Sequence, residues 1–216
     1  MAHLCVTAGA TEEAEREQEP EARALASGAM RDVLVTGFEP FRGERVNPSE
    51  VAVRALAGRP GLRTAVLPVA YRRAEAELAA LLEAAPPRAL LLLGLAAGDA
   101  IRLERVARNC DASEGPDEDG EARVAAPISA LGPAAYGSTL PLAAFAEKLA
   151  GLALPVAWSD DAGGFLCNHV FYRAREWLER RGLLVPCGFV HLPPLGALAL
   201  ERQLEGVAAC LEVLGA

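Results

Sequence analysis

The sequence predicts one α/β domain, an α/β/α sandwich around a largely parallel, mixed sheet. Short apolar runs alternate with longer Ala-, Leu- and Glu-rich segments over residues 32–216, as in parallel sheets whose strands are joined by helices. The run at 88–95 is apolar almost throughout and lies between Pro-Pro and Gly, which is typical of a central strand covered on both faces. Right-handed crossovers would then place functional loops at the carboxyl ends of the strands.

The individual elements follow from local patterns along the chain. Strands are expected where short β-branched or apolar runs end at Gly, Pro or polar residues. Helices are expected where longer segments carry good helix formers, and residues 111–135 are expected to be loop because they hold many Asp, Gly and Pro. The expected strands are 33–36, 64–69, 88–95, 155–159 and 187–192. The expected helices are 49–56, 71–84, 141–152, 168–181 and 198–214.

Residues 1–29 differ in composition from the rest of the chain. They carry six acidic residues against two Arg, and the stretch from Thr11 to Arg23 is dense in Glu and Ala. Such a segment buries too little apolar surface to offset its ordering entropy, so we expect a mobile tail. The folded domain is expected over residues 30–216, and Met30 is a candidate for the true start of translation.

Composition and charge narrow the possible partners. A net charge of −8 and a sequence pI near 5.0 disfavour binding to nucleic acid or to anionic lipid. No apolar stretch approaches the length of about 18 residues that a membrane span needs. The five cysteines include no CxxC pair, which argues against a zinc site or a disulfide framework and favours reduced thiols in the cytoplasm.

Two histidines could serve as a catalytic base, since His3 lies in the predicted tail. His191 is the better candidate than His169, because it stands at the end of an expected strand and before a Pro-Pro turn. A hydrogen-bonded histidine without a catalytic role is the alternative interpretation.

Cys167 follows a glycine turn and is expected to open a helix. A helix N-terminus lowers the pKa of a thiol, and its unpaired N–H groups can bind an oxyanion. A buried, inert cysteine is the alternative, as expected for Cys110, Cys187 and Cys210.

Glu104 and three phenylalanines complete the set of candidates. Glu104 could be a solvated acid paired with an arginine, or the third group that orients a histidine in a Cys-His pair. Phe38, Phe41 and Phe165 flank the glycine turns. They could be core residues, or they could form an apolar box for a flat, uncharged ring.

Several sequence motifs, occurring in the same order as in the family, resemble those of the pyroglutamyl peptidase I family, also called pyrrolidone-carboxylate peptidases. The resemblance extends from about residue 32 to the C-terminus. The opening strand and loop, a glutamate motif, two loop motifs, a nucleophile motif and a histidine motif carry it. These motifs are 33–41 with 47–49, 104–109, 116–120, 132–136, 162–172 and 188–193.

The resemblance implies a cysteine peptidase that removes N-terminal pyroglutamate from peptides through a thioester, without a metal or organic cofactor. Cys167 would be the nucleophile, His191 the general base and then acid, and Glu104 the residue that orients His191. It also implies assembly into a dimer or tetramer. The implied substrate-binding residues are Phe38, Phe41 and Phe165 at the pyroglutamyl pocket and Asn47, which supports the loop.

Two departures from the family pattern keep alternatives open. Asp99 and Ser113 stand where the family often has arginines. One alternative is a weakened member that binds a pyroglutamyl or lactam-like ligand, or a protein partner, without turnover. Another is a cysteine amidase that acts on a free lactam or a glutamine-like amide.

Overall fold

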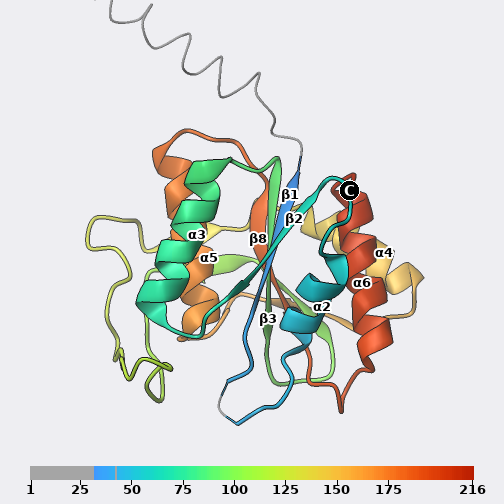
Figure 1. Cartoon of the computed structure of the whole chain (residues 1–216), viewed down its shortest axis with the longest axis horizontal. Coiled ribbons are helices and arrows are strands. Elements are labelled where there is room, and N and C mark those ends of the chain that lie inside the picture. The colour runs from blue at the N-terminus through green and yellow to red at the C-terminus, as the bar shows by residue number, and fades with distance from the viewer. Residues whose placement is uncertain (1–31, 42) are drawn as a thin grey trace, which may run out of the picture.

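The computed structural model describes residues 32–41 and 43–216. Within this part of the chain, a mixed sheet lies between two layers of helices (Figure 1). The predicted α/β/α sandwich is therefore confirmed. The tail expected over residues 1–29 lies outside the described residues, so the tail and the domain boundary at residue 30 stay predictions.

The central sheet has six strands in the described residues, in the order β2-β1-β3-β8-β4-β7. The first four strands in this order are parallel, whereas β4 is antiparallel to β8 and parallel to β7. The sheet is thus mixed and largely parallel, as predicted. Its strands are β1 (Val33–Phe38), β2 (Leu62–Leu67), β3 (Ala89–Leu95), β4 (Ile101–Glu104), β7 (Val156–Ser159) and β8 (Cys187–Leu192).

Helices cover both faces of this sheet. α3 and α5 pack together on one face, and α2, α4 and α6 lie on the other (Figure 1). Each predicted helix agrees with the structure to within two residues at either end. The bounds are α2 (Pro48–Leu56), α3 (Tyr71–Ala84), α4 (Leu142–Gly151), α5 (Leu166–Arg180) and α6 (Leu200–Val213).

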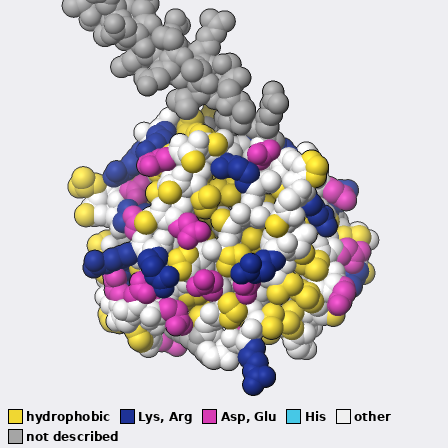
Figure 2. Space-filling model, in the orientation of Figure 1, with side chains coloured by type: hydrophobic (Ala, Val, Ile, Leu, Met, Phe, Trp, Pro, Cys, Tyr) yellow, Lys and Arg dark blue, Asp and Glu magenta, His cyan; other side chains and the backbone are white. Residues whose placement is uncertain are grey.

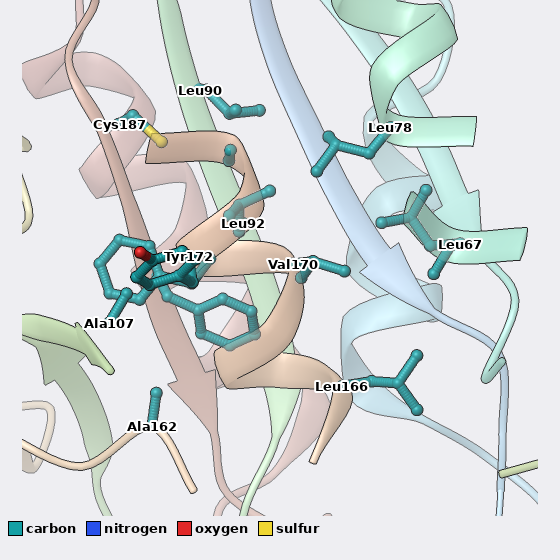
Figure 3. Close-up of a cluster of buried hydrophobic side chains, with 14 of the residues drawn as sticks. Leu67, Leu78, Leu90, Leu92, Ala107, Ala162, Leu166, Val170, Tyr172 and Cys187 are labelled. Atoms are coloured by element: carbon teal, nitrogen blue, oxygen red, sulfur yellow. The ribbon is translucent and has the colours of Figure 1, made fainter. Parts of the chain in front are cut away.

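The layer between the sheet and α5 forms one buried apolar cluster (Figure 3). Val170 and Tyr172 of α5 belong to it together with Leu90 and Leu92 of β3, and all four are fully buried. Removing such side chains from water contributes about 1.5–3 kcal/mol each to folding. This packing fixes the position of α5 on the sheet, and with it the first turn that carries Cys167.

Three strands were not predicted, and one was predicted out of place. β4 was missed, as was the antiparallel pair of β5 (Val106–Arg108) and β6 (Ala135–Gly137). β2 begins and ends two residues before the predicted strand at 64–69. The missed strands are only three or four residues long, so their patterns are too short to identify from sequence.

The Asp117 carboxylate links the long loop between β5 and β6 to the start of α3 through hydrogen bonds. Its Oδ2 accepts a hydrogen bond from the Tyr71 backbone N–H at 2.8 Å. Its Oδ1 accepts from the backbone N–H groups of Asp119 at 3.0 Å and Glu121 at 2.8 Å. A carboxylate at a helix N-terminus satisfies free N–H groups and complements the helix dipole. The loop and α3 therefore hold each other in place.

The surface carries charges of both signs. Basic and acidic side chains are intermingled on the face shown in Figure 2. Among the described residues, none of the helices has the length and hydropathy that crossing a bilayer requires.

Candidate active site

Strands β4 and β8 bring Glu104 and His191 together. In their antiparallel register Glu104 lies directly opposite Phe189. His191 is two residues beyond Phe189 on β8, so Glu104 and His191 are diagonal neighbours on the same face of the sheet. The His191 Nδ1 lies 2.7 Å from Glu104 Oε1. An ionised carboxylate can only accept, so Nδ1–H donates and the neutral ring leaves Nε2 unprotonated. Both side chains are almost completely buried.

Gly94 of β3 places Cys167 on the same face as His191. Gly94 is the register partner of His191 in the parallel β3–β8 pair, so their side-chain directions agree. A Cβ atom added to Gly94 would come within 2.9 Å of the Cys167 Sγ and 2.7 Å of the Phe189 ring. The sulfur atom therefore occupies the space above Gly94, beside the strand that carries His191.

Replacing Gly94 with alanine should lower kcat/KM by about 10²-fold, because the new methyl group would displace the sulfur atom and a shift of about 1 Å can have that effect. Steady-state kinetics on a pyroglutamyl amide measures it. Gly137→Ala is the matched control, since a Cβ atom there meets no atom within 4 Å. Equal activity of the two variants would contradict the placement of Cys167 against Gly94.

The Cys167 thiol does not have the depressed pKa that its position at a helix N-terminus predicts. Burial, and secondarily the negative charge of Glu104, raise its pKa to about 12. The Arg102 charge and a backbone hydrogen bond act in the opposite direction but do not compensate. The expectation of a lowered pKa was therefore wrong, because it considered the helix alone and not the loss of solvent around the sulfur atom.

The pKa of His191 is lowered from its ordinary value of 6.5. Burial is the main cause, and the hydrogen bond to Glu104 opposes it. A neutral imidazole and a neutral thiol are therefore the resting forms of His191 and Cys167 near neutral pH. Such a pair requires that His191 take the thiol proton during the reaction, rather than before it.

The first turn of α5 is built around Cys167. Gly163 has a φ of +86°, a left-handed conformation that favours glycine, and the chain then turns into the helix. Phe165, which caps the helix, makes no side-chain hydrogen bond to the first turn. The N–H groups of Leu166 and Cys167 precede the first intrahelical bond, which runs from the His169 N–H to the Phe165 carbonyl. Neither of them has an acceptor within the helix.

Asn168 anchors this turn to β5. Its side chain accepts a hydrogen bond from the Arg108 N–H at 2.8 Å and donates to the carbonyl oxygens of Arg108 and Cys110, both at 2.9 Å. Asn168 is fully buried. The residue next to the candidate nucleophile is thus fixed by two hydrogen bonds to β5 and by a third to Cys110, just beyond it.

We expect Asn168→Ala to lower the free energy of unfolding by about 2–4 kcal/mol, because it leaves buried backbone groups without partners. Urea unfolding measures this change. Arg108→Ala is the control: its side chain is half-exposed, and Asn168 binds only its backbone. A loss below about 0.5 kcal/mol in Asn168→Ala, the range typical of surface substitutions, would contradict the anchoring role.

Aromatic rings lie next to the first turn of α5. The Phe165 ring lies 5.9 Å from Phe41 and, edge-on, 5.6 Å from Tyr71. Phe41 and Phe165 are half-buried, whereas Phe38 is buried in the core and only 3% exposed. The structure thus brings two of the three predicted phenylalanines together and adds Tyr71, which the sequence analysis did not single out.

Asn47 lies at the base of the loop between β1 and α2. Its Oδ1 accepts from the N–H of Ser49 at 3.0 Å and from its hydroxyl at 2.8 Å, and its amide donates to the Glu39 carbonyl at 3.1 Å. Ser49 Oγ in turn accepts from the Phe38 N–H at 3.0 Å. Asn47 is fully buried and caps α2. These bonds suit the loop-supporting role that the resemblance implies.

His169, the other candidate imidazole, lies in a separate buried cluster. Its Nδ1 is 2.9 Å from Asp111 Oδ2 and its Nε2 is 3.3 Å from Glu75 Oε2. These carboxylates outweigh burial and raise the pKa of His169. Both of its ring nitrogens are thus engaged away from Glu104.

Comparisons with known proteins match most of this chain. The pyroglutamyl peptidase family model, Peptidase_C15, matches residues 31–213. The pyrrolidone-carboxylate peptidase of Gloeobacter violaceus is 41% identical over 197 residues, covering 84% of this chain and 96% of that protein. The protein of the same name from Halalkalibacterium halodurans is 42% identical over 178 residues, covering 79% and 88%.

Solved structures of pyrrolidone carboxyl peptidases have the same fold. The Pyrococcus furiosus structure has a TM-score of 0.81 at 34% identity and covers 84% of this chain and 97% of its own. The Thermococcus litoralis structure has a TM-score of 0.81 at 31% identity, with coverage of 85% and 92%. The chain therefore belongs to the pyroglutamyl peptidase family.

Proposed function

We infer that this chain is a cysteine peptidase that hydrolyses the bond between an N-terminal pyroglutamyl residue and the rest of a peptide. Its family membership supports this function, as does the name pyrrolidone-carboxylate peptidase that its relatives carry. The observation that carries the proposal is the buried hydrogen bond of 2.7 Å between His191 and Glu104, on the face of the sheet where Cys167 lies. A base oriented by a carboxylate beside a thiol is the arrangement that nucleophilic catalysis needs.

The reaction proceeds in two stages. His191 Nε2 takes the thiol proton while the Cys167 Sγ attacks the pyroglutamyl carbonyl carbon, and a tetrahedral oxyanion forms. The C–N bond then breaks, and the amine leaves with the proton that His191 returns. Water, deprotonated by His191, attacks the resulting thioester and releases pyroglutamate, and the proton returns to the thiolate. Glu104 stabilises the imidazolium that exists between these transfers.

Backbone N–H groups at the start of α5 would stabilise the two oxyanions. Leu166 and Cys167 contribute N–H groups that lack intrahelical partners, and the positive end of the helix dipole points the same way. Preorganised donors of this kind contribute about 10²–10³-fold each to kcat. They raise the rate without having to raise the thiolate fraction of the resting enzyme.

Specificity for pyroglutamate would rest on the aromatic rings beside the nucleophile. The half-buried rings of Phe41 and Phe165 offer an apolar surface to a flat lactam ring, and the fully buried Tyr71 packs edge-on against Phe165. A lactam carries no charged amine, whereas an ordinary N-terminus would lose its hydration there without a partner. Phe38 would support this surface from the core, and Asn47 would support the loop that carries Phe41.

Release of a fluorogenic amine from a pyroglutamyl amide by the purified chain, under reducing conditions, tests the proposal. We expect turnover of this substrate, little turnover of the matching prolyl amide, and none of free 2-pyrrolidone or glutamine. Preferential hydrolysis of a free lactam or glutamine would favour the amidase alternative. Binding of the pyroglutamyl amide without turnover would favour the weakened, binding-only member that the residues at Asp99 and Ser113 suggested.

Two further expectations belong to the proposal. A reducing, cytoplasmic location is supported by the thiol chemistry and by the cysteines that are free in the described chain, which are Cys110, Cys167, Cys187 and Cys210.

A dimer or tetramer is expected from the family resemblance. Light scattering coupled to size-exclusion chromatography measures the mass in solution, and a monomer would contradict the expected assembly.

A further inference from the structure

Arg102 is a cation that lies against two of the three proposed catalytic side chains. Its Nε is 3.3 Å from Glu104 Oε1, and its Nη2 is 3.5 Å from His191 Nδ1. Glu104 is fully buried, and its Oε2 has no hydrogen-bond partner. A buried carboxylate that is this sparsely hydrogen-bonded needs a nearby positive charge. Arg102 is placed to be that charge.

The strand register explains why Arg102 points into the site. In the antiparallel β4–β8 pair Arg102 lies directly opposite His191. Residues two apart on a strand share a face, so Arg102 and Glu104 both point toward the His191 side. Ile101 and Leu103, which alternate with them, belong to the core cluster on the opposite face. Arg102 is thus held by the same pairing that positions Glu104.

The charge of Arg102 acts on both proton-transfer partners. It contributes to the lowered pKa of His191, and it partly offsets the increase in the pKa of Cys167. Glu104 has the opposite effect on both groups. Arg102 and Glu104 on β4 are the charged groups of the described chain that act on His191 of β8 and Cys167 of α5 in this way. A guanidinium stays charged at every pH at which the enzyme would work.

We propose that Arg102 is a positioning residue that balances the buried charge of Glu104, so that His191 remains an unprotonated base beside Cys167. Without this cation, the uncompensated carboxylate would raise the pKa of His191 and favour its protonated form. His191 could then no longer accept the proton of Cys167 when substrate binds. The consequence for catalysis rests on the proposed peptidase activity. The effect of Arg102 on the titration of His191 can be measured without substrate.

The titration of His191 by NMR tests the proposal, because the chain has only three histidines. A His191→Gln variant assigns the signal. We expect a midpoint below 6.5 in the wild type and an increase of about one pH unit in Arg102→Gln. Arg102→Lys should restore most of the wild-type midpoint. Arg105→Gln is the matched control, since Arg105 is half-exposed and pairs with Asp160, and it should leave the midpoint unchanged.

The pH dependence of kcat/KM gives the second readout. The acid limb of this profile should shift to higher pH in Arg102→Gln. The variant should therefore lose up to about tenfold in kcat/KM at pH values well below the wild-type midpoint and change little above about pH 8. An unchanged His191 midpoint in folded Arg102→Gln, or failure of Arg102→Lys to restore it, would overturn the proposal. If the wild type lacks turnover but the midpoint still shifts, the proposed function fails and the electrostatic role of Arg102 stands.

Discussion

Turnover of a pyroglutamyl amide is expected to fall by about five to six orders of magnitude when Cys167 is replaced by serine. A serine hydroxyl keeps nearly the same shape but is a much weaker nucleophile, and it loses its proton far less readily than a thiol does. His191 is a weak base because burial lowers its pKa, so it cannot compensate for this difference. The measurement is the rate of fluorogenic amine release at enzyme concentrations high enough to detect the residual activity.

Cys110→Ser provides the matched control for this variant. Cys110 is also free and half-buried, and Asn168 binds its backbone carbonyl but not its sulfur atom. We expect its activity to stay within about twofold of the wild type. Retention of more than a hundredth of wild-type turnover in Cys167→Ser would argue that another group attacks the substrate. Equal losses in both variants would point to a general dependence on free thiols.

Glu104→Gln is expected to lower kcat by about 10³–10⁴-fold while the protein stays folded. Glutamine has almost the same volume, but its amide carries no charge to stabilise the imidazolium. Its NH₂ group can also face His191 Nδ1, which would favour the tautomer whose Nε2 is protonated and unable to accept the thiol proton. Steady-state kinetics, together with circular dichroism to verify folding, measures the effect.

A control variant at an exposed carboxylate distinguishes the loss of kcat in Glu104→Gln from the effect of removing any negative charge. Asp160 pairs with Arg105 and is half-exposed, so Asp160→Asn should change kcat by less than about twofold. If Glu104→Gln lowered kcat no more than Asp160→Asn does, Glu104 would not be the group that orients His191.

Most of the fold could be predicted from the sequence because its strands and helices have distinct local patterns. The apolar run of β3 and the helix-forming residues of α3 identify these elements without knowledge of their partners. β4 could not be identified in the same way. The alternation of Ile101-Arg102-Leu103-Glu104 is a weak strand signal over only four residues, and its insertion beside β8 depends on pairing with residues far along the chain.

The candidate site, like the fold, could be predicted from the sequence only in part, because some of its features depend on tertiary contacts. Cys167, His191 and Glu104 were proposed from the family resemblance, and their arrangement is consistent with those roles. The pKa of Cys167 was predicted in the wrong direction, because its burial and the approach of Glu104 arise only in the folded chain. Arg102 and Gly94 were not singled out, since their proximity to the site follows from strand register.

The position of β8 has a consequence for synthesis of the chain. β8 is the last strand to leave the ribosome, yet it lies between β3 and β4 near the middle of the sheet. Until residues 187–192 emerge, these two strands cannot take their final neighbour, and His191 is absent. Pairings between distant segments form slowly, and strand edges that wait for a partner are prone to aggregate. A nascent or truncated chain that ends before residue 187 would therefore lack both this central strand and the proposed catalytic base.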